Sequence, residues 1–188
     1  GRVTFNFAPT CIPEIEVRQV VIEAVAIGLD NSCELAGDVN SDGSTNVLDV
    51  VQTVAAILGN GTLSDAGAAC ADFNGDGSSN VLDVVQLVAN ILGNGRVDSA
   101  SGVEIIKSSE GASFIADGYV GAIQMTINHG EDFSIEMTDK AMVADYNTKG
   151  NSTTLMVVDP QSSELFTAEV SYTIETVIAA ANQDYIDI

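Results

Sequence analysis

Positive charge is the scarcest property of this 188-residue chain, which has 6 lysine and arginine residues against 27 aspartate and glutamate residues and a formal net charge of −21. Because neutralising phosphate groups requires clustered basic side chains, this balance argues against nucleic acid and anionic lipid as partners. No apolar run approaches the ~20 residues that a membrane-spanning helix needs. We therefore expect neither a nucleic-acid partner nor insertion into a membrane.

Catalytic signatures are also missing. The sequence has no nucleophile elbow, Walker loop, dinucleotide fingerprint or HExxH pattern. Its single histidine, His129, lies between expected strands, where a solvated turn residue is a better interpretation than a general base. Glu131 and Asp132 are adjacent, so on a strand they would face opposite sides and could not flank one glycosidic bond. Tryptophan is absent, which leaves little aromatic surface for gripping a sugar. We predict that the protein is not an enzyme.

Three cysteines, Cys11, Cys33 and Cys70, permit one internal disulfide and leave one thiol over. Cys11 and Cys33 close the shortest loop, so theirs is the predicted bond, although the sequence does not choose between the pairings. Three buried thiols in a cytosolic protein are the alternative.

Two copies of one sequence occupy residues 37–61 and 71–95 and are identical at 19 of 25 aligned positions. Each copy begins with an acidic loop in which oxygen-bearing side chains recur at positions 1, 3, 5, 9 and 12. A hard cation coordinated by 6–8 oxygens at about 2.3–2.6 Å requires this pattern. Gly43 and Gly77 stand at position 6, where the loop must turn sharply with a positive φ. A polar turn without metal is the alternative, but two complete copies argue against it.

We therefore predict two Ca²⁺ ions as cofactors, one in each loop. The ligands would be carboxylate and amide oxygens, with one main-chain carbonyl, from serine, in each loop. The predicted ligands are Asp38, Asn40, Asp42, Ser44, Asn46 and Asp49 in the first loop, and Asp72, Asn74, Asp76, Ser78, Asn80 and Asp83 in the second.

Over residues 34–95 the pair resembles the duplicated loop-helix motif of type I dockerins, in which position 12 is Asp, as Asp49 and Asp83 are here. The resemblance implies docking onto a cohesin-bearing protein. Dockerins usually read that partner with polar residues at loop positions 10 and 11 and a basic pair further along the helix. The residues at these places are instead apolar: Val47, Leu48, Val54 and Ala55, then Val81, Leu82, Val88 and Ala89.

The first repeat predicts a helix over residues 47–58 that is apolar nearly all round and stops at a Leu-Gly-Asn-Gly sequence. A helix with apolar residues on every side is normally buried. The sister helix can cover one face, so the rest is expected to lie against another domain or subunit. This interpretation favours a fixed structural block over a detachable docking module.

From residue 103 onward the sequence alternates between apolar and polar residues, with turn signals at short intervals. Seven to nine short strands of this kind, one of them expected over residues 164–182, predict an antiparallel β-sandwich. Residues 118–137 are similar to a strand region of cohesin domains. The expected fold is mainly β with an inserted α block, divided into N-terminal strands (1–32), a dockerin-like calcium-binding pair (33–96) and a cohesin-like sandwich (103–188).

The strong alternation of the first residues predicts a strand, with Val3, Phe5 and Phe7 on one face. Residues 15–27 are interpreted as one or two further strands, with a short helix as the alternative. Segment 2–8 is a candidate donor that would add to the open sheet edge of another copy. Pairing with its own sandwich is the alternative.

Candidate glycosylation sites are Asn60 and Asn151, each in an Asn-x-Thr/Ser sequon, and Ser99, in a short Asp-Ser-Ala motif similar to one used for O-linked sugar. Ordinary surface turns are the alternative. The chain begins without a basic-then-apolar leader, as a processed product would, and loops of this type suit extracellular calcium levels. We expect a secreted, extracellular or cell-surface protein.

The sequence therefore predicts a non-catalytic, calcium-stabilised structural subunit whose partners are other copies of itself, joined head-to-tail into a pilus-like fibre or fibril by strand donation. One alternative is a dockerin module bound to a cohesin-bearing scaffold. Another is a calcium-stiffened adhesin or carbohydrate-binding module.

Overall fold

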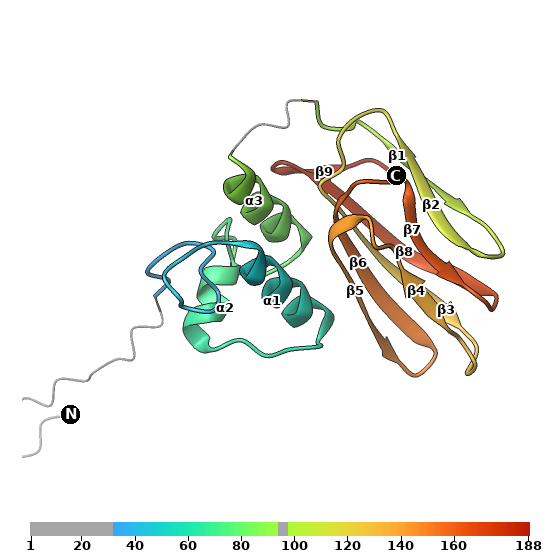
Figure 1. Ribbon diagram of the computed structural model, residues 1–188, viewed down its shortest axis with the longest axis horizontal. Coiled ribbons are helices and arrows are strands. Elements are labelled where there is room, and N and C mark those ends of the chain that lie inside the picture. The colour runs from blue at the N-terminus through green and yellow to red at the C-terminus, as the bar shows by residue number, and fades with distance from the viewer. Residues whose placement is uncertain (1–31, 94–97) are drawn as a thin grey trace, which may run out of the picture. The chain divides into compact units, whose positions relative to one another are not determined.

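The computed structural model describes residues 32–93 and 98–188, which belong to one compact unit. The predicted donor strand with Val3, Phe5 and Phe7, the segment 15–27 and Cys11 lie outside the described residues. The described residues form three helices followed by nine strands (Figure 1). Their bounds are α1 (Val47–Leu58), α2 (Asp65–Ala71), α3 (Val81–Leu92), β1 (Val103–Lys107), β2 (Gly111–Ala116), β3 (Ala122–His129), β4 (Ile135–Met137), β5 (Ala141–Lys149), β6 (Ser152–Pro160), β7 (Glu164–Ala168), β8 (Tyr172–Ala181) and β9 (Asp184–Ile186).

The two long helices begin and end where their sequences indicate. Asn46 caps α1 and Asn80 caps α3, each in a capping box with the aspartate three residues later. Both helices end at a glycine with φ near +81°, a conformation that glycine adopts more readily than other residues. The predicted helix 47–58 is confirmed. Helix α2 was not predicted; its Ser64 N-cap, which accepts a hydrogen bond from the N–H of Gly67, was the available signal.

The strands form two antiparallel sheets, with strand orders β1-β2-β7-β4 and β5-β6-β3-β8-β9 (Figure 1). Residues of both sheets share one buried core, for example Phe166 of β7 with Ile123 of β3 and Leu155 of β6. The predicted antiparallel sandwich with an added α block is therefore confirmed, while its likeness to cohesin stays a prediction. One expected strand was wrong: residues 164–182 divide into β7 and β8, which belong to different sheets.

A second core joins the helices to the five-stranded sheet. It combines Val54 of α1 and Val85 of α3 with residues of β3, β5, β6 and β8. Strand β6 serves both cores, because Leu155 and Val157 face the sandwich interior while Met156 and Val158 pack in the helix-side cluster. All four side chains are fully buried. The continuous apolar run of β6 is thus explained by burial on both faces.

Small residues allow α3 to lie close to the sheet. Ala122 and Ala180 are fully buried in the helix-side cluster. Gly121, just before β3, is also buried, and a Cβ atom built on it would lie 2.8 Å from Cγ1 of Val85. No larger side chain fits at that position without moving the helix.

Polar contacts attach the end of α1 to the edge strand β5. The Nδ2 group of Asn60 donates to Oδ2 of Asp145 at 3.0 Å and to the carbonyl oxygen of Tyr146 at 2.8 Å. In return, Nδ2 of Asn147 donates to the carbonyl oxygen of Leu58 at 2.8 Å. These bonds satisfy one free carbonyl group at the helix end and one on the edge strand.

The start of the sandwich is held by Asp117, which follows β2. Its carboxylate accepts hydrogen bonds from the hydroxyl and the N–H of Ser101 and from the N–H of Gly102. These donors, led by the Ser101 hydroxyl, hold the pKa of Asp117 below its usual range.

The close approach of α3 to the sheet predicts that Gly121→Ala lowers the free energy of unfolding by about 1–3 kcal/mol, because the new methyl group overpacks against Val85. Urea unfolding followed by circular dichroism would measure this. Gly130→Ala is the matched control, since its Cβ would meet nothing within 4 Å. Equal stability of the two variants would show that α3 does not rest on the sheet as described.

Candidate metal centre

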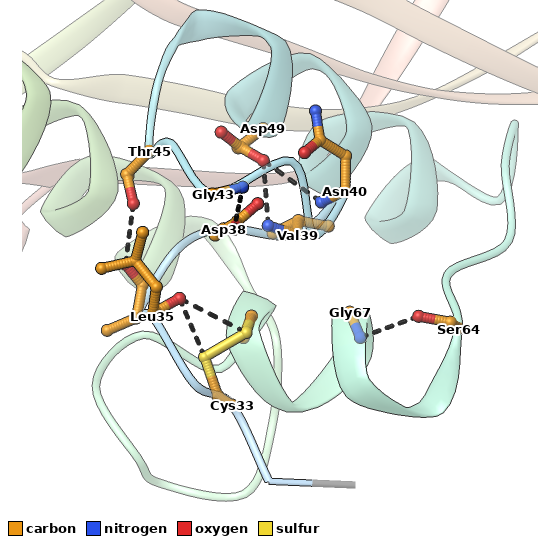
Figure 2. The surroundings of a disulfide bond; sticks show 12 residues. Cys33, Leu35, Asp38, Val39, Asn40, Gly43, Thr45, Asp49, Ser64 and Gly67 are labelled. Carbon is orange, nitrogen blue, oxygen red and sulfur yellow. Dashed lines mark hydrogen bonds between the residues drawn. A yellow bond between two sulfur atoms is a disulfide. The ribbon is translucent and has the colours of Figure 1, made fainter.

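The first loop folds around the carboxylate of Asp38. Oδ1 of Asp38 accepts from the N–H of Asp42 at 3.0 Å. Its Oδ2 accepts from the N–H of Gly43 at 2.8 Å (Figure 2). Gly43 has φ +86°, although a Cβ atom there would meet nothing within 4 Å. Backbone conformation, and not space, therefore requires glycine at this position.

Asp49 closes the same loop from the first turn of α1. Its Oδ1 accepts from the N–H groups of Val39 at 2.9 Å and Asn40 at 3.2 Å, and its Oδ2 accepts from the N–H of Asn46 at 2.8 Å. The side chain is fully buried. One carboxylate thus connects the start of the loop, its end and the helix cap.

The second loop repeats this arrangement. Asp72 accepts from the N–H groups of Asp76 at 3.0 Å and Gly77 at 2.9 Å, and Asp83 accepts from the N–H groups of Asn74 at 3.0 Å and Asn80 at 2.8 Å. Asp83 is fully buried, as Asp49 is. The duplicated sequence is therefore matched by duplicated loop geometry.

Each loop contains oxygen donors of the kind that suits calcium. Carboxylate, amide and main-chain carbonyl oxygens are the donors that Ca²⁺ takes. A carboxylate oxygen has two lone pairs, so one that accepts a single N–H retains a site for a cation. No group of three or more carboxylate, imidazole or thiol side chains in residues 32–93 and 98–188 forms a metal cluster by itself. The amide oxygens of Asn40 and Asn74 and the serine carbonyls would therefore have to complete each donor set.

The predicted disulfide was wrong. Cys33 is bonded to Cys70 of α2, with Cα atoms 4.9 Å apart, and so cannot pair with Cys11 (Figure 2). The shortest-loop argument counts chain entropy alone. The fold decides the pairing instead, because the N–H of Gly37 donates to the carbonyl oxygen of Cys70 and aligns the chain before the first loop with α2.

The single histidine does not lie in a solvated turn, as we had expected. His129 ends β3, is half-buried, and stacks on Phe133 with ring centroids 4.0 Å apart. Its Nε2 lies 2.8 Å from the hydroxyl of Thr153. Aromatic packing thus explains this side chain without a catalytic role.

The three candidate glycosylation residues, Asn60, Ser99 and Asn151, are exposed. The amide nitrogen of Asn60 is engaged with β5, as described above, and Asn151 lies in the turn between β5 and β6. Glycosylation at each of the three stays a prediction.

The sequence did not indicate that the two repeats have different surroundings. Val47, Leu48 and Val51 of α1 are 40, 58 and 43% exposed, whereas Val81 and Val85, the equivalents of Val47 and Val51, are 1 and 2% exposed. An apolar face of α1 is therefore left uncovered by the described residues.

Residues 36–92 match the family model of the dockerin type I domain. This match confirms the predicted resemblance to dockerins, and residues 36–92 are called the dockerin segment below. Because dockerin domains bind calcium, the match supports calcium binding here. Dockerins are non-catalytic docking modules, typically of extracellular proteins, that bind cohesins. Searches of curated proteins and of solved structures found no match to the chain. Within the described residues, every helix is too short or too polar to span a bilayer.

The loop geometry predicts different consequences for two aspartates of the dockerin segment. Both Asp42→Asn and Asp49→Asn should weaken calcium binding by the first loop, measured by calorimetric titration of CaCl₂ into EGTA-treated protein. Only Asp49→Asn should also lower the stability of the calcium-free protein, by about 1–3 kcal/mol, because an amide NH₂ would face buried N–H donors. Asp42 is exposed and tolerates the exchange. Full titration heat in both variants would contradict the predicted first site.

The Cys33–Cys70 bond closes a loop with a sequence separation of 37 residues. Its removal by Cys33→Ser with Cys70→Ser should lower the free energy of unfolding by about 4 kcal/mol through the entropy of the unfolded chain. Urea unfolding would measure the change, and dithiothreitol should destabilise the wild type but not the double variant. A Cys11→Ser variant that is equally destabilised would indicate a different pairing.

Proposed function

We propose that this chain is a non-catalytic extracellular structural subunit, stabilised by two calcium ions, that assembles with other copies of itself into a fibre. The single observation that carries the proposal is the buried cluster shared by the dockerin segment and the sandwich. It supports a dockerin segment that is a fixed part of the subunit.

This cluster argues against a dockerin segment that detaches to bind elsewhere. Val81, Val84, Val85 and Val88 of α3 are at most 2% exposed, packed with residues of the five-stranded sheet. Burying a valine contributes about 1.5–3 kcal/mol. Separating the two layers would return these side chains to water, so the reading face of the second repeat is committed to its own sandwich.

Calcium would act on the same contact. The carboxylates of Asp49 and Asp83 belong both to the loops and to the first turns of α1 and α3. A cation that binds only the folded loops stabilises the folded state in proportion to its affinity. Because these helices cover the sheet, calcium in the loops would also stabilise the covered sheet.

Strand donation by segment 2–8 is the proposed route of assembly, supported by the alternation of Val3, Phe5 and Phe7. The edge of β5 is capped by Asn60, which argues against strand addition there. The outermost strands of the other sheet, β1 and β4, are the candidate acceptors.

A second candidate function is docking onto a cohesin-bearing scaffold. The dockerin match favours it, and so does the exposure of Val47 and Leu48, since these residues at loop positions 10 and 11 of the first repeat stay accessible. The face is apolar, unlike the polar reading residues usual in dockerins.

Negative-stain microscopy of the purified full-length protein tests the proposal. We expect filaments in millimolar calcium, and few or none in EGTA or in a variant lacking residues 1–9. Filaments that persist in the truncated variant would refute strand donation while leaving self-assembly in place. A protein that stays monomeric in calcium but binds an isolated cohesin domain would favour the docking module.

A further inference from the structure

The two repeats present the same apolar triad in different surroundings. Val47, Leu48 and Val51 of α1 correspond to Val81, Leu82 and Val85 of α3 at identical helix positions. Residues three and four apart on a helix lie on one face. The triad of α3 is buried or half-buried, while every member of the α1 triad is at least 40% exposed.

The covered triad shows what kind of surface fits the exposed one. Val81 and Val85 share a cluster with Ala122 of β3 and Ala180 of β8, on the face of the five-stranded sheet that points away from the sandwich core. The hydroxyl of Tyr185 lies 3.5 Å from Oδ1 of the helix cap Asn80. The complement of the triad is therefore the outer face of an antiparallel sheet.

Each subunit has two such outer faces. The face of the five-stranded sheet is already covered in part by its own α1 and α3. The outer face of the four-stranded sheet carries Ile106 and Ile115, which are 37 and 62% exposed. The residues that precede them, Ile105 and Phe114, face the other side of the sheet and pack on the sandwich core. The register pairs Ile106 with Ser113 and Ile115 with Glu104, so the two isoleucines are diagonal neighbours on one face.

We propose that the exposed face of α1, formed by Val47, Leu48 and Val51, docks on the Ile106 and Ile115 face of a second copy of this chain. This interface rests on the self-assembly proposed above and assigns it a second contact besides strand donation. The five-stranded sheet lies between the helices and the four-stranded sheet, so the two docking surfaces belong to different layers of the subunit. A contact between two different surfaces is heterologous and repeats head-to-tail instead of closing into a dimer.

Charge makes the contact dependent on calcium and salt. Asp38 and Asp42 lie in the loop just before the exposed face, and Glu104 lies beside Ile115 on the sheet. These carboxylates would repel one another across the interface. Calcium in the first loop and dissolved salt would both reduce that repulsion, so the association should strengthen with either.

Two substitutions test the interface from opposite sides in the full-length protein. Leu48→Glu places a carboxylate in the first turn of a helix, where the helix dipole tolerates it. Ile115→Lys places an ammonium group opposite Glu104, a favourable cross-strand pair. Each variant should fold normally by circular dichroism. Each should also self-associate at least about tenfold more weakly than wild type in analytical ultracentrifugation with calcium.

Mixing the variants is the decisive measurement. A Leu48→Glu chain keeps an intact sheet face and an Ile115→Lys chain keeps an intact helix face, so an equimolar mixture should associate more strongly than either variant alone, through one restored helix-on-sheet contact per pair. Leu92→Glu, on the exposed end of α3, is the matched control and should assemble as wild type does.

Several results would overturn the interface. One is a mixture that associates no more strongly than either variant alone although both variants are folded. Another is normal assembly of the Ile115→Lys variant together with impaired assembly of the Leu48→Glu variant. That result would mean that the α1 face contacts residues 1–31 or another protein. If both variants assemble normally and only the loss of residues 1–9 prevents it, strand donation stands and this interface fails. A wild-type protein that is monomeric in calcium and high salt refutes both.

Discussion

The contact on which the rest of the structure depends is the packing of α1 and α3 on the five-stranded sheet. It makes β6 a strand buried on both faces, with Leu155 and Val157 in one core and Met156 and Val158 in the other. A sheet covered on both sides needs no polar outer face there, which explains why β6 carries an unbroken apolar run. The same contact buries many of the apolar residues of the two helices, such as Val54 and Val85.

Two acidic loops control the ends of those helices. Each places a buried aspartate at the third helical position, where it accepts hydrogen bonds from the loop backbone and from the helix cap. Without a cation, the clustered carboxylates of a loop repel one another. The predicted cation ligands Asp49 and Asp83 also cap the helices that cover the sheet, so cation binding there would be linked to helix capping and to burial of the sheet.

Much of this fold could be predicted because its signals are local. The loop pattern, the glycine helix stops at Gly59 and Gly93 and the alternation of the strands each depend on residues a few positions apart. The errors concern tertiary contacts, which depend on the whole fold. Cys70 pairs with Cys33 because the folded dockerin segment aligns them, β7 and β8 separate because they join different sheets, and His129 stacks on Phe133 across the β3–β4 connection. Chain entropy and periodicity contain no information on such neighbours.

The different burial of the apolar triads in the two repeats also arises from tertiary packing. A duplicated sequence demands equivalent burial for both triads, since the same apolar groups gain the same free energy by leaving water. The sandwich covers only one of them: Val81 and Val85 are buried in the cluster with Ala122 and Ala180, and Val47 and Val51 remain exposed. The unsatisfied repeat is thus a consequence of joining a pseudo-symmetric pair to a single sheet. Retaining apolar residues on that face is costly in an isolated, highly charged subunit, but is reasonable in one whose neighbours supply the second sheet.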